Sequence, residues 1–336
     1  MLADRFGVRG LLTLSLLFQA GASLFFGTIE HYQSGLPLRV ISGLAGGCVY
    51  AACFRVIVSW FPIKERGLAF GILLAGPSLG LTLANAFSPG LEAILGWRAV
   101  FKAMGGLALL WAFLVFGFMR ENPSDAGRPV SQEGRPVKSG GFLDGTKFVL
   151  KDYNLLLLSL GGFCYIWAFV GFVTWGNTYL KDVLKISLSE AGGIMSAMAI
   201  ISLILAPLAG LWAGGKERSR IILMVASVIL IVAVIFFGQT ASVTLLWCLS
   251  LAVGVACGFI NPIYSLAVSF YTPREWAGAA GGVTACIWQI AGILSPIVSG
   301  WVVGDGDSFG LVWVIIAAGP LVGLVLLSQL GKNRGS

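Results

Sequence analysis

Arg55 is the only full charge that lies well inside a long apolar run of the sequence, residues 36–60. If the run is helical, its i−3, i−4, i−7 and i+4 neighbours are all small: Ala52, Ala51, Cys48 and Ser59. A guanidinium presents a planar fork of donors that matches a carboxylate or a phosphate. Small residues around it leave room for a ligand, so the pattern predicts an anion-binding wall formed by Arg55 and Cys48.

Two other interpretations of Arg55 stay open. A long arginine side chain can extend to the nearer membrane surface, which lies about six residues or ~9 Å away along a helix. It can also pair with a loop carboxylate such as Glu65. In either case the arginine would stabilise the fold and would not contact a ligand.

Ser78, Thr82 and Asn85 form a polar stripe at positions i, i+4 and i+7 of another apolar run. Such a stripe lines a cavity or makes hydrogen bonds between helices. Both interpretations are consistent with the residue types, and we treat the three residues as candidate ligand contacts.

Three further polar residues interrupt apolar runs. Tyr165 belongs to an aromatic segment that suits packing or a membrane-interface belt, or else a platform for a sugar. Asn261 precedes a proline, so a helix kink explains it as well as a ligand does. Gln289 suits a bond between helices or a contact with substrate.

The composition indicates where these residues are placed. Of the 336 residues, 57% are hydrophobic and 11% are charged, whereas a soluble domain carries about 25% charged residues. This balance excludes a soluble enzyme. The six cysteines lie in apolar runs without a CxxC pair, so we expect no metal and no cofactor. The net charge of +7 is scattered between apolar runs, which argues against nucleic acid as a partner.

Ten apolar runs are long enough to cross a bilayer, and they predict an all-α polytopic membrane protein. They cover residues 11–28, 36–60, 68–90, 98–119, 153–179, 191–213, 220–238, 243–270, 277–302 and 309–330. One connection, 121–152, is long and rich in Pro, Gly, Ser and charge, so it is predicted to be a polar linker. We therefore expect a four-span bundle at 1–120, a cytoplasmic linker at 121–152 and a six-span bundle at 153–336.

Lysine and arginine set the expected orientation. Of the 22 such residues, all but six lie on the side that carries the two termini and the linker. Arg55 lies within a span, and the opposite side holds Arg39, Arg98, Lys102, Lys181 and Lys185. Because positive residues concentrate on the cytoplasmic side, both termini and the linker are predicted to be cytoplasmic, in the cell (inner or plasma) membrane.

An ordered set of motifs resembles the major facilitator superfamily. LADRFGVRG at 2–10 is similar to the G-x-x-x-D-R-x-G-R-R loop between the second and third helices of that family, without its leading glycine. Matching motifs follow in family order: Arg39-x-x-x-Gly43, WFPIKERG at 60–67, GWRAVF at 96–101 and GAAGGVTACIWQIAGILSPIVSG at 278–300. GLWAGGKERSR at 210–220 departs from the repeated loop motif, because Gly214 stands where the family has aspartate.

The resemblance implies the major facilitator fold, with these ten spans as helices 3–12 of the usual twelve. We expect about 60 upstream residues to supply the first two helices. The resemblance also implies two halves that rock about a central site. In such a protein the loop residues would act as a conformational gate, and they are Asp4, Arg5, Gly7 and Arg9.

FRVIVSWFPIKERG at 54–67 resembles the fourth helix of organic-anion carriers, namely hexuronate and galactonate symporters and organophosphate antiporters. Those carriers place an arginine sixteen residues after the first arginine of the helix, as Arg55 follows Arg39. The symporters carry a glutamate where this chain has Gly46. The resemblance implies a monomeric secondary transporter whose partners are the lipid bilayer and a small anionic substrate, an organic acid or a sugar phosphate.

GILLAGPSLG at 71–80 supports an alternative, because it resembles a motif of drug exporters. The alternative is an antiporter for drugs or hydrophobic solutes, which usually needs an intramembrane carboxylate to attract cations. No span contains Asp or Glu away from its ends. A coupling proton site would then lie in the two expected upstream helices, or the protein exchanges anions without a proton; both remain open.

A single cysteine at position 135, in a cysteine-free background, tests the orientation. The residue lies in the predicted cytoplasmic linker, so an impermeant thiol reagent should label it only after the cells are opened. Labelling from outside intact cells would reverse the orientation.

Overall fold

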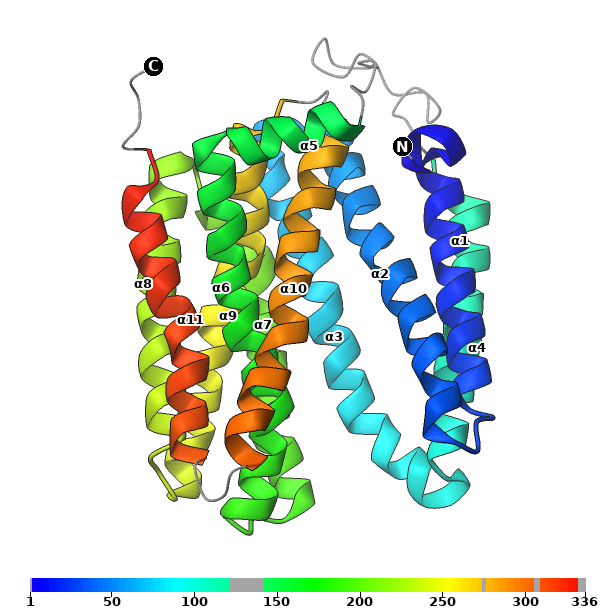
Figure 1. Ribbon diagram of the computed structural model, residues 1–336, viewed down its shortest axis with the longest axis vertical. Coiled ribbons are helices and arrows are strands. Elements are labelled where there is room, and N and C mark those ends of the chain that lie inside the picture. Colours follow the sequence, from blue (N-terminus) through cyan, green and yellow to red (C-terminus); the bar gives the residue numbers. More distant parts are fainter. Residues whose placement is uncertain (1, 121–141, 274–275, 305–308, 332–336) are drawn as a thin grey trace. The chain divides into compact units, whose positions relative to one another are not determined.

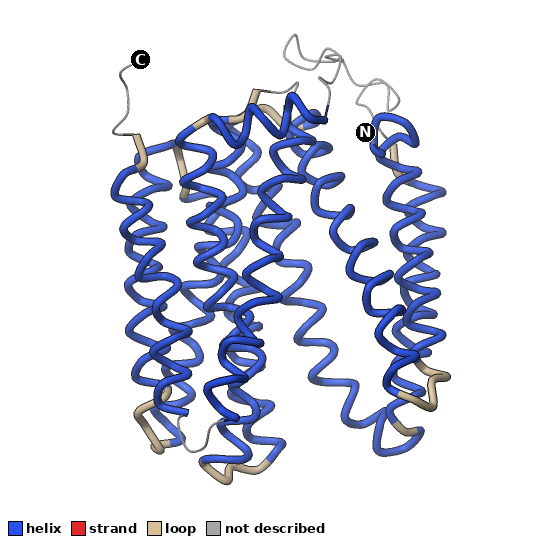
Figure 2. Tube along the Cα trace, viewed as in Figure 1, coloured by secondary structure: helices blue, strands red, loops and turns tan. Residues whose placement is uncertain are grey.

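The computed structural model describes residues 2–120, 142–273, 276–304 and 309–331, which contain helices and no strand (Figure 2). Within these residues ten helices are long and apolar enough to cross a membrane, which confirms the predicted spans. In chain order the elements of Figure 1 are α1 (Leu2–Phe26), α2 (Tyr32–Trp60), α3 (Ile63–Leu95), α4 (Trp97–Phe118), α5 (Phe142–Lys151), α6 (Tyr153–Thr178), the π-helical turn η3 (Tyr179–Val183), α7 (Leu188–Trp212), α8 (Lys216–Phe237), α9 (Val243–Tyr271), α10 (Ala277–Gly304) and α11 (Phe309–Gln329).

Local chemistry explains several helix ends. Pro62 precedes the first residue of α3, where a helix tolerates proline nearby because the first N–H groups have no intrahelical partner. Gly96 separates α3 from α4 with a φ of 78°, a conformation that favours glycine. Asp152 caps α6, and its carboxylate accepts a hydrogen bond from the backbone N–H of Leu155 at 2.8 Å.

The last part of the predicted linker forms a helix that the sequence analysis did not foresee. In α5, Val149 is fully buried and Lys147 is exposed, as in an amphipathic helix. Phe148 stacks on Trp276 with ring centroids 6.1 Å apart, and Gly145 lies against the same indole. Residues 121–141 of the linker lie outside the described residues.

The described chain divides into two compact units. One contains residues 1–62, 83–148 and 273–285, and the other contains 63–82, 149–272 and 286–336. These boundaries pass through α3 and α10, so they differ from the expected bundles at 1–120 and 153–336. The division into those two bundles stays a prediction.

In the first unit, α1 packs against both α2 and α4 (Figure 1). Val8 and Leu11 of α1 are buried with Ala52 of α2 in an apolar cluster. At the other end of α1, Ser23 donates to the backbone carbonyl of Phe101 in α4 at 2.8 Å. Van der Waals packing and one interhelical hydrogen bond thus hold α1 in place, as is usual between membrane helices.

In the second unit, α6 packs against α11 and α9, and its glycines accept large rings. A side chain at Gly162 would overlap the indole of Trp288 from α10, and one at Gly161 would press on Tyr264 from α9. The indole N–H of Trp288 donates to the backbone carbonyl of Ser159 at 3.1 Å. Glycine therefore sets how closely α9 and α10 approach α6.

A close backbone approach joins the start of α3 to the end of α7. A Cβ atom at Gly67 would overlap the carbonyl oxygen of Gly210, and one at Gly210 would overlap that of Gly67. One turn further, Gly71 lies against the backbone of Ala206. Small residues on both helices form this contact, which we call the α3–α7 seam.

Gly67→Ala tests the seam. Its methyl group would meet backbone rather than a movable side chain, so the two helices must separate, with a destabilisation of about 1–3 kcal/mol. The matched control is Gly76→Ala on the same helix, where nothing lies within 4 Å of the added atom. Thermal unfolding in detergent should show a lower midpoint for Gly67→Ala alone. Equal midpoints for the two variants would contradict the close contact.

Candidate functional site

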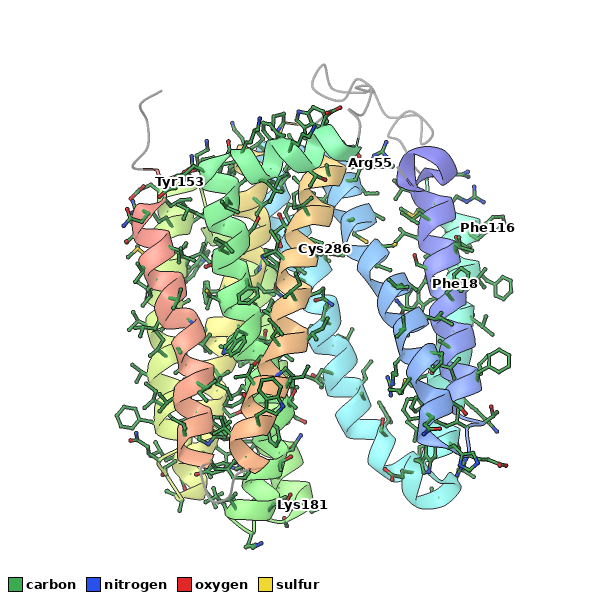
Figure 3. The ribbon with its side chains drawn as sticks, in the orientation of Figure 1. Phe18, Arg55, Phe116, Tyr153, Lys181 and Cys286 are labelled. Atoms are coloured by element: carbon green, nitrogen blue, oxygen red, sulfur yellow. The ribbon has the colours of Figure 1, made fainter. Side chains whose placement is uncertain are left out.

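Arg55 lies on α2 five residues before its end at Trp60, or about 7.5 Å along the helix axis. The side chain is half-buried. Its Cδ atom is 3.9 Å from the position that a Cβ atom would take at Gly278, so its aliphatic stem lies beside the start of α10 (Figure 3). One residue earlier, the ring of Phe54 is fully buried against Gly281. Glycines of α10 thus provide the space in which this part of α2 packs.

The small residues near Arg55 contact protein. Cys48 packs against the apolar cluster of Val8, Leu11, Leu12 and Ala52 between α1 and α2. Ala51 lies 3.9 Å from the position of a Cβ atom at Gly282. The expected open wall is therefore partly filled by α1 and α10. Small residues bring helices close as readily as they make room for a ligand, and this explains the difference.

The polar stripe on α3 forms hydrogen bonds within the protein. The hydroxyl of Ser78 donates to that of Ser202 on α7 at 3.4 Å, which extends the α3–α7 seam. Thr82 donates to the backbone carbonyl of Ser78 at 2.9 Å. Asn85 is part of α3, but its side chain lies outside the described residues. For Ser78 the observed role is a bond across helices, one of the two interpretations that the sequence left open.

Tyr165 is buried in α6, with its ring centroid 5.9 Å from that of Phe169, and its hydroxyl lies near the thiol of Cys257 of α9. Asn261 is half-buried on α9, and its backbone carbonyl accepts from Ser265 at 3.3 Å. Tyr165 therefore joins α6 to α9. The backbone of Asn261 takes part in bonding within its helix just before Pro262.

Gln289 has a different environment. It is exposed on α10, and Cys286, three residues earlier on the same face, is exposed too (Figure 3). Trp288, its immediate neighbour, points the other way and is buried against α6. Gln289 lies near the middle of the span Ala277–Val303. An exposed amide at this depth is costly in lipid, so the position suits a water-filled path.

The gate residues begin α1. Gly7 interrupts the helix with φ 70° and ψ 163°, so the regular helix of the span starts after it. The guanidinium of Arg9 lies 4.6 Å from the ring centroid of Phe116 in α4. The side chains of Asp4 and Arg5 lie outside the described residues. The Gly7 conformation gives a physical reason for glycine at this position in the motif.

Gln19 is a further candidate, which was not predicted from the sequence. It is a half-buried amide near the middle of α1, and its Nε2 atom lies 3.3 Å from the position that a Cβ atom would take at Gly46 of α2. Ser15 and Ser23 stand four residues before and after it on the same helix face. The polar stripe of Ser15, Gln19 and Ser23 in a largely apolar span is the signal that could have identified it.

The described residues contain no group of three or more His, Cys, Asp or Glu that could hold a metal ion. What the arrangement offers instead is a set of helices that cross the membrane and carry a few polar groups. One is an arginine near a helix end, and two are amides, Gln19 and Gln289, near mid-span.

Residues 1–296 match the Major Facilitator Superfamily. The chain belongs to the Major Facilitator Superfamily. It is therefore a transmembrane transport protein, and the predicted fold and family are confirmed.

Superfamily members of similar sequence cover nearly the whole chain. It is 25% identical to the probable sulfoacetate transporter SauU of Cupriavidus necator, over 99% of this chain and 80% of that protein. It is 26% identical to the probable galactarate/D-glucarate transporter GudP of Bacillus subtilis, over 96% and 77%. It is 25% identical to the D-galactonate transporter of Escherichia coli, over 95% and 79%.

A solved structure of a superfamily member supports the fold. The human organic anion transporter MFSD10 superposes with a TM-score of 0.75 at 18% identity, over 97% of this chain and 78% of that one. At this identity the likeness concerns the fold alone.

Gly7→Ala tests the gate's backbone. A residue with a Cβ atom is strained at a φ of 70° and a ψ of 163°, by roughly 1–3 kcal/mol, so the variant should unfold at a lower temperature. Gly21→Ala on the same helix, with nothing within 4 Å of the added atom, is the control and should match the wild type. If Gly7→Ala unfolds at the wild-type temperature, glycine is not required at this position.

Proposed function

We propose that this chain carries a small organic anion, an organic acid or a sugar phosphate, across the cell membrane by alternating access. It acts as a monomer, with both termini in the cytoplasm. The observation that carries the proposal is the near full-length similarity to several proteins named as transporters of organic acids. Their named substrates share an acidic group on a short carbon skeleton.

Arg55 is the proposed contact for the acidic group. A guanidinium at the centre of an apolar span is unfavourable by ~2.5–3.5 kcal/mol on insertion scales, and by less toward the end of the span, where Arg55 lies. A carboxylate or phosphate would offset that energy with charge-assisted, bidentate hydrogen bonds. Gly278 of α10 adds no side chain beside the aliphatic stem of Arg55.

The α3–α7 seam supports the rocking part of the proposal. Its helices belong to the two expected bundles, and Gly67 and Gly210 lie at their predicted cytoplasmic ends. Contacts between backbones and small side chains lose little conformational entropy when they form, because few rotamers are fixed. A contact of this kind suits a closure that must open in every transport cycle. Asp4, Arg5, Gly7 and Arg9 are the proposed latch on the same side.

Arg55→Lys and Arg55→Ala test the anion contact. Lysine keeps the charge and loses the fork, so the KM for galactarate uptake into proteoliposomes should rise by about tenfold or more. Alanine should abolish uptake while the protein still inserts and purifies. If lysine supports uptake with the wild-type KM, Arg55 only reaches the membrane surface.

Arg39→Lys is the matched control on the same helix. Its guanidinium lies 4.3 Å from the ring centroid of Phe26, an aromatic contact at the far end of α2. It should leave the KM for galactarate within about twofold, because lysine can also lie over a ring. A KM that rises equally in both lysine variants would point to general destabilisation.

A further inference from the structure

Gln19 and Gly46 meet near the middle of two adjacent spans. Gln19 lies within the span Gly7–Phe26 of α1, and Gly46 lies within the span Gln33–Trp60 of α2. The Nε2 atom of Gln19 is 3.3 Å from the position of a Cβ atom at Gly46. Both residues belong to the same compact unit, so their relation depends on the packing of α1 against α2.

The amide of Gln19 has unused hydrogen-bonding capacity. Among the described residues none is a hydrogen-bond partner of this side chain, whereas Ser23, one turn away, is bonded to Phe101 of α4. The side chain is half-buried, so it remains accessible. A primary amide carries two donors and one acceptor oxygen, and leaving them unpaired away from water is unfavourable. The position thus requires water or a ligand.

Of three neighbouring glycines in α2, Gly46 is the one that meets this amide. Nothing lies within 4 Å of a Cβ atom built at Gly43 or Gly47, which stand three residues before and one residue after Gly46. At Gly46, by contrast, an added Cβ atom would lie 3.3 Å from the amide nitrogen of Gln19. A longer residue there would press on Gln19 and reduce its access. Gly46 therefore determines how the amide is presented.

The chemistry of the amide indicates what it would bind. An amide both donates and accepts hydrogen bonds, and an alcohol hydroxyl does so too. A hydroxyl can therefore accept from the amide N–H or donate to the amide oxygen. A carboxylate only accepts, and it is matched better by a guanidinium. The amide therefore complements the hydroxyl groups of a hydroxylated acid, while a cationic group would bind its carboxylate.

We infer that Gln19 is a specificity-determining residue that binds a hydroxyl group of the transported acid, and that Gly46 keeps the amide accessible. The inference rests on the proposed function, because it concerns the same substrate. It makes this protein a carrier that prefers polyhydroxylated acids over acids of equal charge without hydroxyls.

Galactarate and adipate form the matched pair of probes. Both are six-carbon dicarboxylates, and they differ only in the hydroxyls of galactarate. In proteoliposomes containing the full chain, Gln19→Leu should raise the KM for galactarate by about tenfold, the usual effect of one lost hydrogen bond. The KM for adipate should change by less than about twofold. A galactarate KM that equals that of the wild type would overturn the inference.

Gly46→Ala gives a second, independent test. Its methyl group would contact the Gln19 amide, so galactarate uptake should weaken several-fold, whereas Gly43→Ala and Gly47→Ala, which meet open space, should be silent. In a Gln19→Leu background Gly46→Ala should have no additional effect, because both changes act on one group. Fully additive effects would show that Gly46 acts elsewhere and would overturn its assigned role.

The outcomes separate this inference from the proposed function. If the wild type takes up both acids and Gln19→Leu behaves like the wild type, the inference is wrong and the proposed function still holds. If the wild type takes up no organic acid, both the proposed function and the inference are wrong.

Gln19→Asn keeps a shorter amide, so it should recover part of the galactarate affinity that Gln19→Leu loses. If the folded Gln19→Asn variant recovers none of it, the result counts against hydroxyl binding.

Discussion

Close approach of helix backbones is the constraint on which this structure depends. In lipid each helix satisfies its own backbone hydrogen bonds, and apolar side chains gain little by leaving an apolar solvent. Helices then associate where small residues let their backbones meet. Gly67 and Gly210 do this for α3 and α7, and Gly254 does it for α9, where an added side chain would overlap Ile201 of α7.

This constraint also decides where polar groups can act. Once glycine and alanine fix the distances between helices, a polar side chain either finds a partner on the neighbouring helix or faces open space. Ser78 belongs to the first kind, since its hydroxyl bonds to that of Ser202. Gln19 and Gln289 belong to the second kind among the described residues.

The sequence predicted the spans well because the length and apolarity that a bilayer requires can be read directly from it. It did not predict α5, because the Pro- and Gly-rich stretch before it dominated the composition of the connection. Small residues around Arg55 were ambiguous for a physical reason: the same residue types suit a ligand wall and a helix contact. Only the positions of α1 and α10 show that Cys48 and Ala51 face protein.

Gln19 was missed for another reason. Ser15, Gln19 and Ser23 form a polar stripe in the sequence, like the one on α3, but a stripe alone does not distinguish a ligand contact from a bond between helices. Its relation to Gly46 needs two helices in register, which no single-helix pattern contains. Pairwise geometry of this kind is what the structure adds to the sequence.

The fit of Trp288 against Gly162 constrains how the contact between α6 and α10 can be redesigned. A side chain at Gly162 would overlap the indole, and a smaller residue at Trp288 would leave a void and remove the hydrogen bond to the backbone carbonyl of Ser159. A change at either position alone therefore destabilises the contact. A library that varies this contact has to change both codons together.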